Sequence, residues 1–66
     1  MKVWLNGEPQ EVPDAASVAD ALTGHDVPSR GVAVAVDGEV VPRASWASSV
    51  LVEGARLEVL TAVQGG

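Results

Sequence analysis

Two dipeptides, Asn6-Gly7 and Asp37-Gly38, constrain the fold of this chain more than any other feature of its sequence. Both are typical of two-residue β-hairpin turns, because Asn, Asp and Gly accept the positive φ angles that such turns require. Each dipeptide follows a short segment with the side-chain alternation of a strand: Val3 and Leu5 share one face before the first turn, and valines alternate with alanines before the second. The sequence therefore predicts two β-hairpins, and any fold proposed for it has to accommodate both.

The first predicted hairpin takes up residues 1–12. Alternation along its first strand places Val3 and Leu5 on one face and Trp4 on the opposite face. The second strand should lie at an edge of the sheet, because Pro9 lacks the N–H that an inner strand donates to its neighbour. The core is thus expected on the side of Val3 and Leu5.

A second hairpin is predicted over residues 31–41 and a last strand over residues 57–63. The large residues of this hairpin alternate with alanines and are expected to face the core: Val32, Val34 and Val36. In the last strand Leu57 and Val59 should face inward, and the outward positions are Glu58, Leu60 and Ala62. Residues 63–66 are predicted to form a flexible C-terminal tail.

A short helix is predicted between the two hairpins. Ser17 is a favourable N-cap, and Asp20 follows it at the spacing of a capping box. Gly24 is placed to end the helix, and residues 25–30 are expected to form a loop. The positions at i, i+3 and i+4 that would form the buried face are Val18, Ala21 and Leu22.

The order of hairpin, helix, hairpin and last strand favours an α+β fold over a doubly wound α/β sheet. It fits one mixed sheet of four to five strands that covers one helix. If the last strand pairs with the first, it lies at the centre of the sheet, and the helix lies on a single face. This is the β-grasp, or ubiquitin-like, arrangement, and we expect it to form a single domain over residues 1–66.

Composition excludes several classes of function. The 66 residues contain no Cys and one His, so packing of the 47% hydrophobic residues has to hold the fold, and no metal site or catalytic triad is expected. Nine acidic residues against four basic ones give a charge of −5 with no basic stripe, which argues against nucleic acid as a partner. No leader and no membrane-spanning run is apparent, so a cytoplasmic protein without a membrane partner is expected.

The second half of the chain carries a family resemblance. A Val-Pro-Arg-x-x-Trp pattern over residues 41–46 occurs together with a terminal Gly65-Gly66 pair, and the Asp37-Gly38 turn precedes both. In this combination the sequence resembles the thiamine-biosynthesis sulfur carriers of the ThiS family. The resemblance extends over essentially the whole chain, although it is weaker in the first half.

The resemblance implies a carrier that is itself neither an enzyme nor the holder of a cofactor. A ThiF-like adenylating enzyme would activate the Gly66 carboxylate with ATP, and a sulfur donor such as a cysteine desulfurase would convert it to a thiocarboxylate. A ThiG-like thiazole synthase would then take the sulfur. In this interpretation Gly66 carries the sulfur and Gly65 is its slender stem.

Docking of these partners is predicted on the outward side of the sheet. If the first and last strands are neighbours, Trp4 and Leu60 would form an exposed apolar patch bordered by acids such as Glu58, with Ala62 on the same face. The alternative for Trp4 is simple packing on Lys2.

Three other functions stay open from the sequence alone. The chain could carry sulfur for molybdopterin or cysteine synthesis, with the same chemistry and a different acceptor. It could be a ubiquitin-like modifier joined to lysines of other proteins. It could also be a binding module whose terminal glycines have no role.

Overall fold

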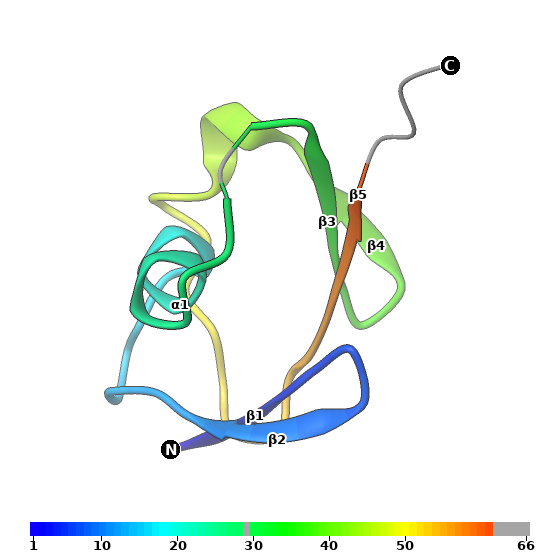
Figure 1. Cartoon of the computed structure of the whole chain (residues 1–66). Helices are drawn as coiled ribbons and strands as arrows, with labels where there is room; N and C mark the ends of the chain where they lie inside the picture. The colour runs from blue at the N-terminus through cyan, green and yellow to red at the C-terminus, as the bar shows by residue number, and fades with distance from the viewer. Residues whose placement is uncertain (29, 62–66) are drawn as a thin grey trace.

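A computed structural model of the protein describes residues 1–28 and 30–61, and within them shows a five-stranded sheet with one α-helix against one of its faces (Figure 1). The elements, in chain order, are β1 (Lys2–Leu5), β2 (Glu8–Glu11), α1 (Val18–Gly24), β3 (Val32–Val36), β4 (Glu39–Val41), a 3₁₀ helix η1 (Arg43–Ser45) and β5 (Arg56–Thr61).

The strands follow the order β2-β1-β5-β3-β4, so the last strand lies at the centre of the sheet. β5 runs parallel to β1 and antiparallel to β3, and each hairpin supplies one outer strand. Figure 1 shows α1 on a single side of this sheet. The predicted α+β class and β-grasp arrangement are therefore confirmed, including the pairing of the last strand with the first.

Both predicted hairpin turns are present and have the expected backbone geometry. Asn6 and Gly7 have φ angles of 50° and 85°, and Asp37 and Gly38 have 50° and 88°. Two consecutive positive φ angles match the twist of antiparallel strands. Asp37 also holds its turn against the central strand, because its N–H donates to the Arg56 carbonyl (2.8 Å) and its Oδ1 accepts from the Arg56 N–H (3.0 Å).

The capping box of α1 is confirmed. The Asp20 N–H donates to Ser17 Oγ at 3.0 Å, and the Ser17 N–H donates to Asp20 Oδ2 at 3.0 Å. The helix ends at Gly24, as expected, but the left-handed residue that reverses the chain is Asp26, at φ 58°. Val27 then closes the end, because its N–H donates to the Leu22 carbonyl at 2.9 Å.

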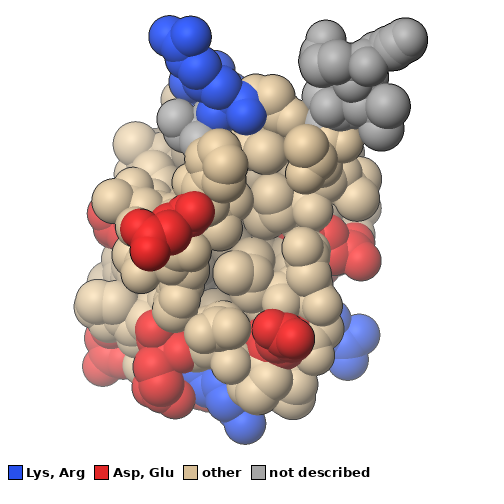
Figure 2. All heavy atoms as spheres, in the orientation of Figure 1, with Lys and Arg blue, Asp and Glu red and all other residues tan. Residues whose placement is uncertain are grey.

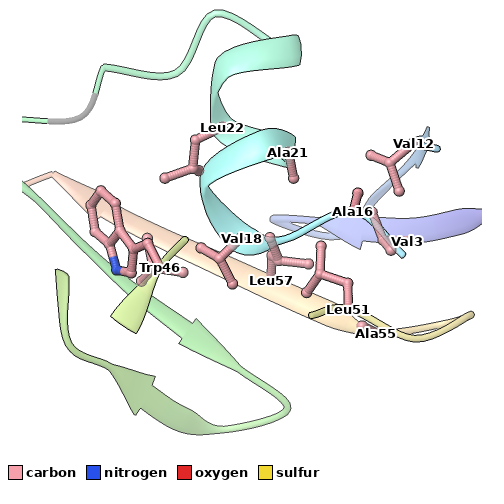
Figure 3. Packing of buried hydrophobic residues seen from close by; sticks show 11 residues of the cluster. Val3, Val12, Ala16, Val18, Ala21, Leu22, Trp46, Leu51, Ala55 and Leu57 are labelled. Atoms are coloured by element: carbon pink, nitrogen blue, oxygen red, sulfur yellow. The ribbon is translucent and has the colours of Figure 1, made fainter. Parts of the chain in front are cut away.

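The core lies between α1 and the sheet and is built largely from Val, Leu and Ala (Figure 3). Trp46 fills its side near η1 and is only 5% exposed. Its indole N–H donates to the Val41 carbonyl at 2.9 Å, so the polar atom of this large side chain is satisfied. The buried members of the core are Val3, Val12, Ala16, Val18, Ala21, Leu22, Val34, Trp46, Leu51, Ala55 and Leu57.

The capping box should make stability depend on pH. The backbone N–H of Ser17, and second its hydroxyl, lower the pKa of Asp20 below its ordinary value of 3.8. A carboxyl with a lowered folded-state pKa stabilises the fold above its unfolded-state pKa, and this stabilisation is lost as the pH falls through the lowered value. Asp20→Asn should therefore lower stability at neutral pH and reduce the further loss on acidification.

Urea unfolding at neutral pH and at about pH 3 would measure this difference. Thr23→Ala, an exposed position of the same helix, is the control and should keep the wild-type response to acid. An Asp20→Asn variant that loses as much stability on acidification as the wild type would contradict the assignment.

Candidate functional site

The sheet face turned away from α1 is called the outer face from here on. Trp4 stands opposite Arg56 in the parallel pair of β1 and β5. Because side chains alternate along a strand, every second residue of β5 from Arg56 onward shares this face. The members of the outer face used below are Trp4, Ala33, Ala35, Val40, Arg56, Glu58 and Leu60.

Trp4 and Leu60 both lie on the outer face, but the prediction that they form one apolar patch was wrong. Trp4 is level with Arg56, and Glu58 stands between Arg56 and Leu60 along β5. Four residues of strand separate their positions by roughly 13 Å. Trp4 is half-buried, and Lys2 Nζ lies 5.2 Å from its ring centre, so the packing on Lys2 that was the alternative to a docking role is present.

A different apolar patch surrounds Leu60. Leu60 is 66% exposed and lies opposite Ala33, while Val40 is 74% exposed and lies opposite Ala35. Glu58 borders these four residues, which we call the Leu60 patch, because it is the partner of Ala35 in β5. Sequence reasoning missed the alanines and Val40, although the inward assignment of Val32, Val34 and Val36 already implied that the residues between them face outward.

The outer face is hollowed between the two hairpin turns. One hollow of about 380 Å³ is lined by Trp4, Gly7, Arg56, Leu57 and Glu58. A second, of about 430 Å³, is lined by Asp37, Gly38, Arg56 and Glu58. Since Arg56 and Glu58 border both hollows, the surface offers one charge of each sign beside an aromatic ring. Such a surface suits contact with another protein more than enclosure of a small ligand.

Asn6 has a second role that its turn position did not reveal. Its backbone N–H donates to the Leu57 carbonyl at 2.9 Å. Its side-chain Oδ1 accepts from the Val59 N–H at 2.8 Å, and its Nδ2 donates to the Val59 carbonyl at 3.3 Å. The Asn6 side chain thus forms the two hydrogen bonds to Val59 that a further residue of β1 would otherwise form. It does so at the point where the main chain of β1 turns away from β5.

Charge is spread over the surface. In the view of Figure 2 the Lys and Arg side chains stand apart from one another, at the top, the right and the bottom of the face, and do not form a stripe. Within residues 1–28 and 30–61, no group of three or more His, Cys, Asp and Glu could hold a metal ion. In the same part of the chain, no helix has the length and apolar character needed to cross a membrane.

Three of the predicted site residues, Ala62, Gly65 and Gly66, lie outside the described part of the chain. The last described residue is Thr61, at the end of β5. The structure thus brings Glu58 and Leu60 to the outer face of the central strand and sets Trp4 farther down the same face.

Comparison with known proteins gives consistent matches. The family model of the ThiS family matches residues 3–66. A crystal structure of a thiamine biosynthesis protein (ThiS) from Geobacter metallireducens is 28% identical, with a TM-score of 0.86 and full coverage of both chains. A solution structure of a thiamine biosynthesis protein from the same organism gives a TM-score of 0.78, covering 100% of this chain and 88% of that one.

A curated relative, a thiazole synthase from Paramagnetospirillum magneticum, is 37% identical over 67 residues. The match takes in the whole of this chain, which spans about a fifth of the length of that relative (20%).

The Asn6 side chain should stabilise the end of β5. Asn6→Gly keeps the left-handed backbone but removes both bonds to Val59, so the free energy of unfolding should fall by about 1 kcal/mol. Hydrogen exchange should show faster exchange of the Val59 N–H, with the Val3 N–H of the β1–β2 hairpin as the internal control. Unchanged exchange at Val59 would contradict the role assigned to Asn6.

Proposed function

This chain belongs to the ThiS family, and from that premise we propose that it carries sulfur for the synthesis of the thiazole ring of thiamine. The observation that carries the proposal is the family match over residues 3–66, which takes in Gly65 and Gly66. The likeness to a thiamine biosynthesis protein over the full chain supports the same pathway.

The reactive group in this proposal is the Gly66 carboxylate. A carboxylate is a poor electrophile, so a ThiF-like adenylating enzyme first joins it to AMP from ATP and releases pyrophosphate. Hydrosulfide then displaces AMP and leaves a thiocarboxylate. Where a donor such as a cysteine desulfurase supplies the sulfur as a persulfide, a thiol reduces the persulfide and is itself oxidised to a disulfide, which releases the sulfur at the sulfide level. The thiazole synthase takes this sulfur, and the similarity to a thiazole synthase supports that partner.

The carrier contributes presentation and no catalytic side chain. Five residues follow Thr61, and a fully extended segment of that length spans roughly 16 Å at ~3.3 Å per residue. Gly65 and Gly66 have no Cβ, so the last two residues can pass through a channel too narrow for other residues. Positioning and electrostatic stabilisation of the reaction are then supplied by the partner enzymes.

The outer face is the proposed docking surface. The Leu60 patch is exposed and apolar, Glu58 borders it, and Trp4 lies farther along the same face. Ala62, which follows β5 in sequence, belongs to the same proposal. Because the chain carries a charge of −5, partners with basic residues around an apolar centre would be complementary to it.

Intact-protein mass spectrometry tests the proposal. After incubation with ATP, the adenylating enzyme and a sulfur source, the chain should gain the mass difference of one oxygen replaced by sulfur. A variant without Gly66 should stay unchanged, while Gly54→Ala, a change in a turn far from the terminus in sequence, should still gain sulfur.

Other results would contradict the sulfur-carrier assignment. Covalent adducts with lysines of other proteins, without sulfur, would indicate a modifier. Sulfur gain with no transfer to thiazole synthase would indicate another acceptor pathway.

Docking through the outer face gives a separate prediction. Leu60→Ala and Trp4→Ala should each weaken binding of the adenylating enzyme by about 1–2 kcal/mol, because both remove apolar contact area at the interface. Val50→Ala is the matched control: Val50 is 60% exposed but is bridged to Ser17 beside α1, and it should leave the affinity unchanged. Isothermal titration would measure the three affinities. Equal loss in all three variants would place docking elsewhere.

A further inference from the structure

The central strand is paired unequally on its two sides. Toward β3, pairing runs along five residues of β5, from Leu57 to Thr61. Toward β1, pairing covers only Arg56 and Leu57, because β1 ends at Leu5 and the chain turns at Asn6-Gly7. The other four of its six residues, from Glu58 to Thr61, therefore have a neighbouring strand on one side alone.

The direction of the backbone groups follows from the hydrogen bonds. The carbonyl of Leu57 and both backbone groups of Val59 point toward β1, since they bond to Asn6. The N–H and C=O of Arg56 point the other way, toward Asp37. In an antiparallel ladder this direction alternates from residue to residue. The N–H and C=O of Thr61 must therefore point to the β1 side, one step beyond the Asn6 side chain.

Among the described residues, no strand stands beside Thr61 on that side. The two outer edges of the sheet differ from this open side of β5. β2 carries Pro9, and β4 has three residues with Pro42 directly after it, so both edges resist further pairing. The sequence from Leu60 to Gly66 contains no proline and no charged residue. The open side of β5 is thus unprotected against an added strand, whereas the ordinary edges are blocked.

We propose that an extended strand of the adenylating enzyme pairs with β5 at Thr61, on the side where β1 has turned away. The inference rests on the proposed function, which supplies this enzyme as the partner. An added strand would satisfy the Thr61 N–H and C=O and would lie end-on to the Asn6-Gly7 turn. Exposed Leu60 next to it would give the same partner an apolar contact on the outer face.

Strand addition suits a carrier because main-chain hydrogen bonds would fix the direction in which the chain continues toward Gly66. Such bonds do not depend on which side chains the carrier has there. The position of β5 is also fixed, because β3 pairs with its other side over five residues. A second copy of this chain could also use an open strand, so the experiment has to separate the two occupants.

Thr61→Pro tests the main-chain contact. It removes the N–H that points to the open side and leaves the ladder to β3 intact, and a proline allows the extended conformation of Leu60 before it. Its affinity for the adenylating enzyme should fall about tenfold. Thr61→Ala keeps the N–H and should bind within about twofold of the wild type.

Hydrogen exchange of the wild-type carrier provides a test that does not depend on the variants. The Thr61 N–H should exchange fast in the free carrier, while the Val59 N–H is already protected by Asn6. Adding the adenylating enzyme should slow exchange at Thr61 strongly. Fast exchange at Thr61 in the complex, or equal affinity of the Pro and Ala variants, would overturn the inference.

The outcomes distinguish a failure of the proposed function from a failure of the proposed strand addition. If the wild type is not adenylated at all, the proposed function fails. If it is adenylated while Thr61→Pro binds as well as Thr61→Ala, only the strand addition fails. Protection of Thr61 that rises with carrier concentration in the absence of enzyme would assign the open strand to a second copy and overturn the choice of partner.

Discussion

The simultaneous pairing of β5 with β1 and β3 is the interaction on which the rest of the structure depends. Two-stranded hairpins are marginal by themselves, and the last strand joins both into one sheet. The same insertion buries Leu57 to 1% exposure beneath α1, at the centre of a core that no disulfide can support, because the sequence contains no Cys. Because the central strand is also the last one, its end lies in the middle of the sheet, beside exposed apolar residues of the outer face.

Local features of this fold could be predicted from sequence because each depends on neighbours in the chain. The Asn6-Gly7 and Asp37-Gly38 turns follow from the φ angles that these residues tolerate, and the Ser17–Asp20 capping box follows from spacing. The register between β1 and β5 could not be predicted, since it depends on packing between residues more than fifty positions apart. For that reason Trp4 and Leu60 were expected to form one apolar patch, although Arg56 and Glu58 separate them.

The candidate site likewise has features that could be predicted from the sequence and features that could not. Alternation was sufficient to assign Glu58 and Leu60 to the outer face, and it would have been sufficient for Ala33 and Ala35. The bonds from Asn6 to Val59 could not be foreseen, because Asn6 was fully explained as a turn residue and its second role needs the neighbouring strand. The proposed role of Gly66 comes from family membership, and the fold contributes the rigid strand that precedes it.

Transfer of sulfur from the carrier to the ring tests this account most directly. The carrier would be loaded with radiolabelled sulfur at Gly66, freed of small molecules, and mixed with thiazole synthase and its other substrates. The account predicts that the label appears in the thiazole product in proportion to the carrier consumed. Label that stays on the carrier, or is released as sulfide while unlabelled thiazole forms, would contradict it.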